Sequence, residues 1–241
     1  MNEFNYQKVK LVGLTEPKID ECKNAQELIA YIARVSNPSN QHSHSTSDKL
    51  LKYCIKNAHW SVFETVNVVL EIETTRDIGR QLLRHRSFTF QEFSQRYADP
   101  TKELTFVTRE CRMQDMKNRQ NSVKAEDYQL MAFWEHYQKR VTDLATEAYN
   151  WATTNGIAKE QARFLLPLST TTKLYMHGTI RDYIHYVNLR VAHGTQKEHA
   201  DIAKEIQNIF LDNLPIIGQA LNWRKNEGTN DASICTLGSG S

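Results

Sequence analysis

Apolar residues recur at helical spacing along much of the chain. The strongest pattern covers residues 126–154, where eight apolar side chains form one stripe that ends at Gly156. Residues three and four positions apart share one face of a helix, so the pattern predicts a long helix with this face in the core. The stripe consists of Leu130, Phe133, Trp134, Tyr137, Val141, Leu144, Ala145 and Ala148.

Six shorter segments also have helical patterns. Asn24 is expected to cap the first, and Ser47 or Asp48 the second, because short polar side chains accept hydrogen bonds from the free N–H groups at a helix start. Pro215 is expected to break the last pattern. The predicted helices cover residues 24–35, 47–56, 76–84, 160–165, 181–191 and 196–211.

Alternation of apolar and polar residues predicts the strands. Residues 66–74 alternate most clearly, as in a half-buried strand, and shorter candidates cover 9–14, 104–108 and 173–176. Residues 36–47 are expected to form a loop, and the polar residues 113–124 a mobile stretch. Without a repeat or a linker, these elements predict one α+β domain over residues 1–223, with a mixed sheet and long helices, followed by a polar tail over 224–241.

The composition permits a folded core and excludes several classes of protein. Of the 241 residues, 40% are hydrophobic and 24% are charged, and the formal net charge is +2. This charge is too small to attract nucleic acid or an anionic membrane as a whole. No apolar run approaches the roughly 20 residues that span a bilayer, and residues 1–6 lack a secretory pattern. Four cysteines without CxxC spacing fit reduced thiols, so a soluble cytoplasmic protein is expected.

Three arginines stand four residues apart on one predicted helix. Arg76, Arg80 and Arg84 would repel one another by a few tenths of a kcal/mol per pair, so an anion should compensate them. For Arg76 and Arg80, a solvated face neutralised by Glu71 and Glu73 is the favoured interpretation. Arg84 differs because it opens a denser cluster of basic and aromatic residues.

That cluster is Arg84-His85-Arg86, followed after seven residues by Ser94 and then by Arg96, with four aromatic residues interleaved. Guanidinium groups bind phosphate through planar forks, and aromatic rings suit a flat base. The chain lacks a GxxxxGK[ST] loop and a GxGxxG turn, so side chains would hold the phosphate. The segment therefore predicts a pocket for a phosphorylated heterocycle.

The same segment matches the RHRx7S signature of flavin-dependent thymidylate synthases, a family that the chain resembles from about residue 24 to 215. Gln81 stands at the family's Gln-x-x-Arg position. The other matching segments are His59-Trp60-Ser61-Val62-Phe63-Glu64, Ala162-Arg163-Phe164-Leu165-Leu166-Pro167-Leu168, and Leu189-Arg190 with Gln196 and Glu198.

The resemblance implies methylation of dUMP to dTMP, with 5,10-methylenetetrahydrofolate as carbon donor and FAD, reduced by NADPH, as hydride carrier. It also implies a homotetramer with active sites at subunit interfaces, without a membrane or nucleic acid. The implied FAD contacts are His59, Ser61, Arg84, His85, Arg86, Glu92, Thr179, Arg181 and His185. The implied nucleotide contacts are Gln81, Arg84, Glu92, Ser94, Gln95, Arg96, Arg163 and Arg190.

Arg190 corresponds to the arginine that activates the uracil ring in this family. A fixed cation beside a pyrimidine carbonyl stabilises negative charge at N3, which makes the ring more nucleophilic. Two departures affect the neighbouring positions. Thr179 and His185 stand where many members have asparagine, and Gln95 replaces a glycine of the usual Ser-Gly-Arg.

Two other functions remain open at this stage. The arginine pocket could belong to a non-catalytic protein that binds a deoxynucleotide or RNA. The chain could also be a classical thymidylate synthase with Cys54 or Cys111 as nucleophile, although neither lies in a Pro-Cys-His setting. The histidines lack a recognised ligand spacing, so no metal site is predicted.

Overall fold

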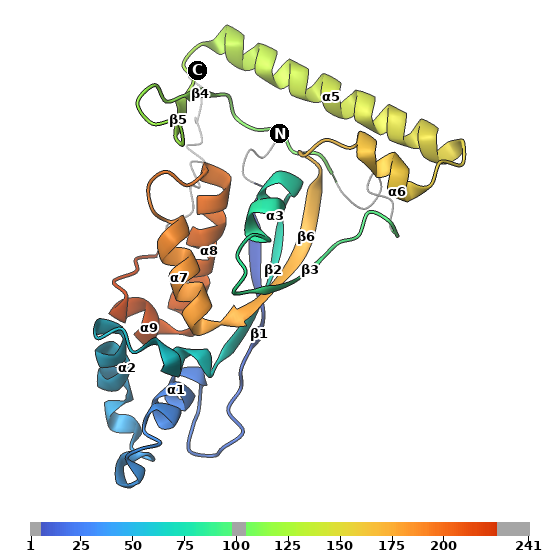
Figure 1. The fold of residues 1–241 in the computed structure, drawn as a ribbon. Coiled ribbons are helices and arrows are strands. Elements are labelled where there is room, and N and C mark those ends of the chain that lie inside the picture. Colours follow the sequence, from blue (N-terminus) through green and yellow to red (C-terminus); the bar gives the residue numbers. More distant parts are fainter. Residues whose placement is uncertain (1–5, 98–104, 226–241) are drawn as a thin grey trace, which may run out of the picture.

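The structure is a computed structural model, and it describes residues 6–97 and 105–225. A four-stranded sheet occupies its centre, with helices packed against one face (Figure 1). Helix α5 (Tyr128–Thr154) lies along one end of the molecule, and α1 (Ala25–Ala33) and α2 (Ser47–Lys56) lie at the other end (Figure 1). Within these ranges, no helix is long and apolar enough to cross a membrane.

The strands of the sheet follow the order β1 (Lys8–Leu14), β2 (Asn67–Thr75), β6 (Thr171–Thr179) and β3 (Thr89–Glu92). The single α+β domain predicted from the sequence is confirmed. The sheet is antiparallel at each pair of neighbours, so the predicted mixture of parallel and antiparallel pairs is wrong. Strands β2 and β3 are parallel to each other, but they are not neighbours. Strand β6 lies between them and runs in the opposite direction, so both of its pairings are antiparallel.

One face of the sheet forms the core and the other is polar. Val68, Leu70 and Ile72 of β2 are buried, whereas Glu71 and Glu73 alternate with them on the opposite face. This is the period of two expected for a half-buried strand. Glu71 and Glu73 pair with Lys173 of β6, at 3.5 and 2.9 Å. Their predicted role as partners of Arg76 and Arg80 is therefore wrong, because they face away from the helices.

Helices cover the apolar face of the sheet. Ile78 and Leu82 of α3 (Arg76–Leu82) are fully buried there, next to side chains from α7 (Ile180–Arg190) and α8 (Lys197–Asn213). Short helices complete the chain, namely α6 (Lys159–Ala162), α9 (Pro215–Ala220) and the 3₁₀ turns at Pro38–Asn40, His44–Thr46, Trp60–Glu64 and Arg163–Leu165. The predicted helices are present, with ends that shift by a few residues.

The helix starts follow the predictions only in part. Asn24 caps α1 by accepting from the backbone N–H groups of Gln26 and Glu27, as predicted. The predicted cap of α2 is wrong, because Thr46 occupies the cap position without a side-chain bond to the helix backbone, and the Ser47 hydroxyl accepts from Arg34 instead. Pro215 ends the pattern of α8, as predicted, but it is also the first residue of α9. Proline is tolerated there because the N–H groups of the first helical turn have no partner within the helix.

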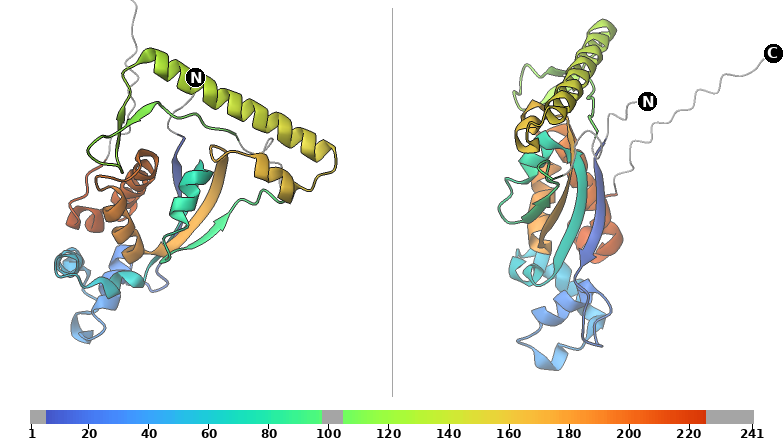
Figure 2. Two further views of the ribbon diagram at one scale, coloured as in Figure 1. Left: turned by 45° about the horizontal axis from the view of Figure 1, so that its top comes forward. Right: turned by 90° about the vertical axis from the view of Figure 1, so that its right-hand side faces the viewer.

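Helix α5 has the predicted length, and Gly156 follows its end with a φ of +81°. The prediction that its apolar stripe belongs to the core is wrong. Trp134 is 44% exposed and Leu144 65% exposed, and the buried residues of the helix are Ala145, Tyr149 and Ala152. Figure 2 shows the reason, since most of α5 projects past the sheet and only its C-terminal part meets α6. Helical spacing shows that one face is apolar, not what covers it.

Two further predicted segments differ in detail. Residues 112–124 form a small hairpin of β4 (Arg112–Gln114) and β5 (Ser122–Lys124), where the sequence predicted a mobile stretch. The Arg112 guanidinium ties the two strands by donating to the Ser122 hydroxyl at 2.7 Å. Residue 104 of the predicted 104–108 strand lies outside the described residues, and Phe106 makes only an isolated bridge to Thr170. Most of the predicted tail, from residue 226, also lies outside them.

A glycine in β6 is required by the packing of Phe88. A Cβ at Gly178 would lie 2.5 Å from Phe88 Cδ1, far inside van der Waals contact. We expect Gly178→Ala to lower the free energy of unfolding by about 1–3 kcal/mol, because the buried ring must move. Urea denaturation measures this loss. The matched control is Gly13→Ala in β1, where a Cβ meets Val69 at an ordinary 3.5 Å; an equal loss in both variants would contradict the explanation.

Candidate active site

Helix α3 separates two groups of the residues singled out by the sequence. It follows β2 directly, and Arg76 and Arg80 line a polar cavity on one side of it. Gln81 is hydrogen-bonded on another side to Gln196 and to His199 of α8. The short helix thus presents cationic groups and a carboxamide in different directions.

We call the first group the arginine cavity. Its volume is about 340 Å³, and its charged lining has three arginines against one glutamate. Gln95 is only 4% exposed, and its Nε2 finds no hydrogen-bond partner within the described chain. A buried donor without a partner is costly, so a polar ligand in the cavity would stabilise it. The lining residues are Arg76, Arg80, Gln95, Glu160, Gln161, Arg163, Phe164, Leu166, Pro167 and Leu168.

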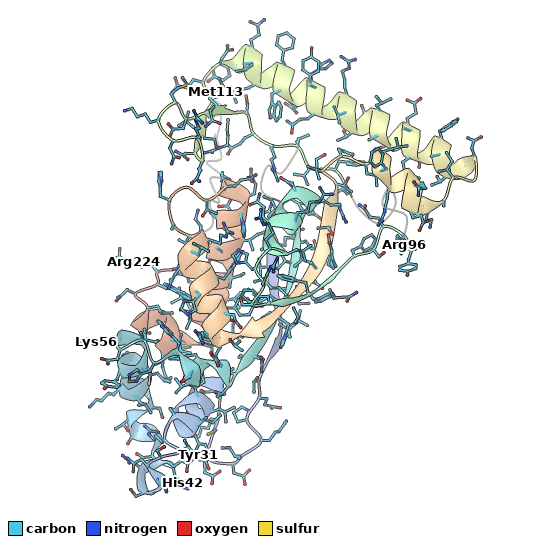
Figure 3. The ribbon with its side chains drawn as sticks, viewed as in Figure 1. Tyr31, His42, Lys56, Arg96, Met113 and Arg224 are labelled. Carbon is cyan, nitrogen blue, oxygen red and sulfur yellow. The ribbon has the colours of Figure 1, made fainter. Side chains whose placement is uncertain are left out.

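Several predicted nucleotide contacts meet at this cavity. Arg96 forms an ion pair with Glu160 at 2.9 Å, and Arg163 Nε donates to the backbone oxygen of Glu160 at 3.3 Å. Figure 3 shows Arg96 on the side of the molecule where α6 lies. Because Glu160 and Arg96 are partly exposed, another anion can replace the Glu160 carboxylate in this ion pair.

Arg76 and Arg80 line this cavity, although the sequence favoured a solvated face for them. The signal that points to the cavity is the spacing of four residues, which places both guanidinium groups on one helix face. Arg76 also pairs with Glu92 at 3.3 Å, and the Thr172 hydroxyl donates to the same carboxylate at 2.8 Å. Glu92, a predicted contact of both FAD and nucleotide, therefore borders the cavity side of α3.

The second group centres on Arg190, at the C-terminal end of α7. Arg190 Nε donates to His85 Nε2 at 3.0 Å. An arginine has no acceptor, so His85 must be unprotonated at Nε2 and carry its proton at Nδ1. Burial, and secondly the charge of Arg190, lower the pKa of His85 to about 4. At neutral pH the pair is therefore a cation beside a neutral imidazole.

His199 and Tyr186 complete this second group, and neither was singled out by the sequence. His199 is fully buried, with Nδ1 3.1 Å from Gln81 Oε1 and Nε2 3.0 Å from the Tyr186 hydroxyl. Burial, and to a lesser extent Arg190 and His85, lower the pKa of His199 to about 3. Burial also raises the pKa of Tyr186. No local motif distinguishes these residues. In the sequence, His199 is one of many positions on a predicted amphipathic helix.

The third group lies at the start of α7. Thr179 caps the helix, since its hydroxyl accepts from the Asp182 N–H and donates to the Asp182 carboxylate. Threonine thus supplies the cap at the position where many members of the resembled family have asparagine.

Arg181 forms an ion pair with Glu64, and the His185 ring packs edge-on against Trp60 with centroids 5.1 Å apart. His59 and Ser61 are exposed in the same 3₁₀ segment or beside it.

Three of the predicted residues remain. Arg84 and Arg86 flank His85 and are exposed, and the Ser94 hydroxyl accepts from the Arg96 N–H at 3.4 Å. Within one chain, no contact among the described residues joins Arg163 to Arg190. Figure 1 shows α6 near the end of α5, whereas α7 lies beside α8.

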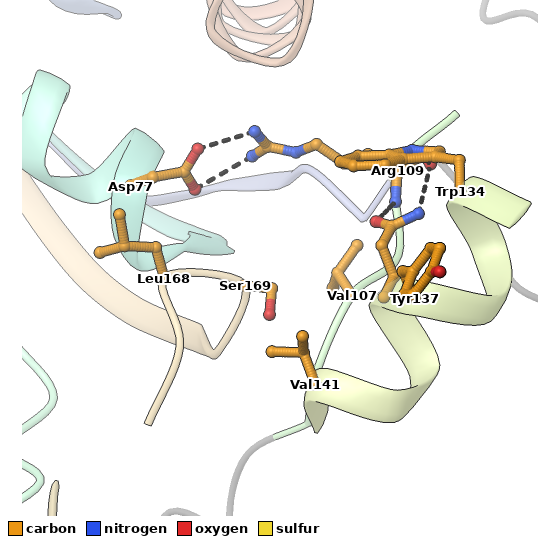
Figure 4. A pocket seen from close by; sticks show the side chains of 9 residues that line it. Asp77, Val107, Arg109, Trp134, Tyr137, Val141, Leu168 and Ser169 are labelled. Carbon is orange, nitrogen blue, oxygen red and sulfur yellow. Dashed lines mark hydrogen bonds and ion pairs between the residues drawn. The ribbon is translucent and has the colours of Figure 1, made fainter. Parts of the chain in front are cut away.

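Another cavity, of about 370 Å³, lies between α5 and the segment before β4 (Figure 4). Its walls are largely apolar and include Trp134, Tyr137 and Val141. Arg109 lines it, but both terminal nitrogens of Arg109 are bound to the Asp77 carboxylate, at 2.7 and 3.0 Å. This cavity offers no cation that is available for phosphate, so the arginine cavity is the better nucleotide site.

Cys54 and the possible metal ligands form no second centre in the part of the chain that the structure describes. Cys54 is buried in α2, and burial raises the pKa of its thiol, which disfavours the thiolate needed for nucleophilic attack. Among residues 6–97 and 105–225, no three His, Cys, Asp or Glu side chains are placed to hold a metal ion.

Comparison with known proteins gives consistent results. Residues 19–216 match the model of the family described as Thy1, thymidylate synthase complementing protein. A probable flavin-dependent thymidylate synthase of Paramecium bursaria Chlorella virus 1 is 50% identical over 214 residues, which cover 89% of this chain and 98% of the relative. The flavin-dependent thymidylate synthase of Synechocystis sp. is 45% identical over 218 residues, covering 89% and 99%.

A solved structure supports the fold. The UMP/dUMP methylase PolB from Streptomyces cacaoi, bound with 5-Br UMP, superimposes with a TM-score of 0.76 at 23% identity. The match covers 90% of this chain and 93% of the methylase. At this identity the likeness concerns the fold alone.

The buried histidines predict a loss of stability in mild acid. In the unfolded chain His199 regains a pKa near 6.5, against about 3 in the fold, so the unfolded state binds more protons between these values. The free energy of unfolding therefore falls as the pH drops from 6.5 toward 3. His199→Asn should remove about 2 kcal/mol of the loss between pH 6.5 and about pH 5. Urea unfolding at both pH values checks this, and equal losses in the two proteins would contradict it.

Proposed function

The chain belongs to the thymidylate synthase complementing protein family, that of the flavin-dependent thymidylate synthases, and on this premise we propose that it methylates dUMP to dTMP. The observation that carries the proposal is the arginine cavity. It combines three arginines with a buried glutamine donor that lacks a partner, next to the RHRx7S segment. This donor set suits the dianionic phosphate of a nucleotide.

The dUMP phosphate would bind in the arginine cavity. Arg163, Arg76 and Arg80 supply the charge, and Gln95 supplies an N–H that is already desolvated. Arg96 would bind at the edge of the cavity, where the Glu160 carboxylate now occupies the position that an anionic ligand would take. Ligand binding would exchange this carboxylate for the phosphate, so little new charge is buried without a partner.

The uracil ring would lie against Arg190. Since Arg190 Nε is bound to His85, its two terminal nitrogens remain to donate to a carbonyl and to N3 of the base. A planar cation in this position stabilises negative charge on the ring and raises the nucleophilicity of its carbon. Gln81, hydrogen-bonded in the same group, would orient the base through its carboxamide.

The flavin would be FAD, held by His59, Ser61, Arg84, His85, Arg86 and Glu92, and by Thr179, Arg181 and His185 at the start of α7. The residues fit such a group, because Arg84 and Arg86 are exposed cations and His85 carries a proton at Nδ1. When bound, a flavin stores the two electrons that side chains cannot store. NADPH would reduce it, and methylenetetrahydrofolate would supply the carbon.

A second copy of the chain would complete the site. Within one chain, no contact among the described residues joins Arg163 to Arg190, and the apolar stripe of α5 is exposed over several turns. Large apolar residues exposed along one helix face indicate an interface. We therefore propose the homotetramer expected for the family, in which neighbouring copies bring these two groups together.

The function is tested with purified protein that is yellow from bound flavin. We expect release of tritium from dUMP labelled at carbon 5 when methylenetetrahydrofolate and NADPH are present. Arg190→Ala should keep the flavin and lower turnover by about 100-fold or more, as expected for the loss of an electrostatic contact made in the transition state. The control is Arg34→Ala, which removes an arginine bound to Thr46 and Ser47. A colourless protein that binds dUMP without turnover would instead favour the non-catalytic binding protein.

The oligomer is tested at the α5 stripe. Leu144 is 65% exposed, and Leu144→Glu should dissociate the assembly because it places a charge in an apolar contact. The control is Val35→Glu, at a residue with a similar 67% exposure outside α5. Sedimentation should give four times the 28.0 kDa chain mass for the wild type and the control, and less for Leu144→Glu. An active wild-type monomer would contradict the interface.

A further inference from the structure

Five side chains form a continuous hydrogen-bond chain that runs from α7 through α8 to α3 and back to the start of α8. Its members are Tyr186, His199, Gln81, Gln196 and Glu198. We propose that His199 is a positioning residue of the dUMP site, which holds the Gln81 carboxamide in one orientation for the uracil ring. The inference rests on the proposed function, because Gln81 is a nucleotide contact only if dUMP binds here.

Glu198 determines which groups donate and which accept along this hydrogen-bond chain. A carboxylate only accepts hydrogen bonds, and Glu198 also lies 3.6 Å from Arg109 Nε. Gln196 must therefore turn its Nε2 toward Glu198, at 2.9 Å. Its Oε1 is then left to accept from Gln81 Nε2, at 2.7 Å. This second bond leaves Gln81 Oε1 as the atom that faces His199.

His199 completes the sequence of donors and acceptors. Because Gln81 Oε1 accepts, His199 Nδ1 must donate across the 3.1 Å contact. A neutral imidazole has only one N–H, so His199 Nε2 accepts from the Tyr186 hydroxyl at 3.0 Å. The tautomer with the proton at Nδ1 is the one that satisfies both contacts.

This arrangement excludes the flipped carboxamide of Gln81. After a flip, Gln81 Nε2 would face the Nδ1–H of His199, which places two donors together. Gln81 Oε1 would face Gln196 Oε1, which places two acceptors together. In the observed orientation, Gln81 keeps one N–H and one lone pair that are not used by Gln196 or His199. These are the groups available to a base, and the Nδ1–H of His199 helps to hold them in place by donating to Gln81 Oε1.

The setting of His199 suits a positioning role. The side chain is fully buried between α3, α7 and α8, so it has little freedom to move. Its ring lies 6.0 Å from the His85 ring and 5.8 Å from the Tyr186 ring. An apolar residue would fill this space without a polar group to satisfy, so packing alone does not explain a histidine here.

The test compares two replacements of His199 with one matched control, all as flavin-loaded protein. His199→Asn keeps a donor at the Nδ1 position, whereas His199→Leu removes both polar contacts. Tyr183→Phe is the control, because the Tyr183 hydroxyl is also buried on α7 but donates to the Met176 backbone oxygen, outside the hydrogen-bond chain. Equilibrium dialysis gives the Kd of dUMP, and initial rates give KM and kcat.

We expect His199→Leu to raise the Kd and KM of dUMP by about tenfold, the size of one lost hydrogen bond. His199→Asn should restore both values to within about threefold of the wild type, and Tyr183→Phe should leave them unchanged. Equal Kd values for the wild type and His199→Leu would overturn the inference, as would equal losses in His199→Asn and His199→Leu.

The tautomer gives a readout that does not depend on turnover or on the folding of a variant. In the wild type labelled with ¹⁵N-histidine, the His199 resonances should show a protonated Nδ1 and an unprotonated Nε2. The opposite tautomer would overturn the inference even if every variant failed to fold. A wild type that neither binds nor methylates dUMP would overturn the proposed function, and that outcome is seen before any variant is compared.

Discussion

The close packing of α3 on strands β2 and β6 is the constraint on which the candidate site depends. Gly79 lets the helix approach the sheet, since a Cβ there would already lie 3.2 Å from the Thr172 methyl group. Ile78 and Leu82 anchor the same helix in the core. Seven residues in this fixed position direct two arginines into the arginine cavity and the Gln81 carboxamide toward α8. A helix that lay farther from the sheet would lose both alignments.

Electrostatics around Arg190 depend on the neutrality of its neighbours. A guanidinium beside two protonated imidazoles would be strongly unfavourable in a desolvated setting. Burial avoids this by keeping His85 and His199 neutral, and each then serves as a hydrogen-bond acceptor or donor of defined direction. The cation is therefore held by a partner that does not neutralise it, and its charge remains available to a substrate.

The proposed assembly would explain both the exposed stripe of α5 and the division of the candidate residues. Helix α5 has 27 residues and three buried side chains, and it is held by its contact with α6 and by hydrogen bonds of Trp134 and Gln138 to Arg109. Its exposed apolar residues, such as Leu144, would be buried by a further protein surface. The same contact would let the arginine cavity of one copy serve the Arg190 group of another. Stability and function would thus require the same interface.

The sequence by itself determined the elements and the type of chemistry. Helical and alternating periods follow from local backbone geometry, so α5, β2 and the Asn24 cap could be predicted, and the RHRx7S segment indicated a phosphate pocket with a flat base. Only the tertiary structure decided what covers each face. In the structure, Trp134 and Leu144 are exposed, Arg76 and Arg80 line the arginine cavity, and β6 lies between β2 and β3. The tertiary structure also brought His199 to Gln81 across 118 positions of the chain. Such contacts depend on how distant elements pack, and no local period of residues carries that information.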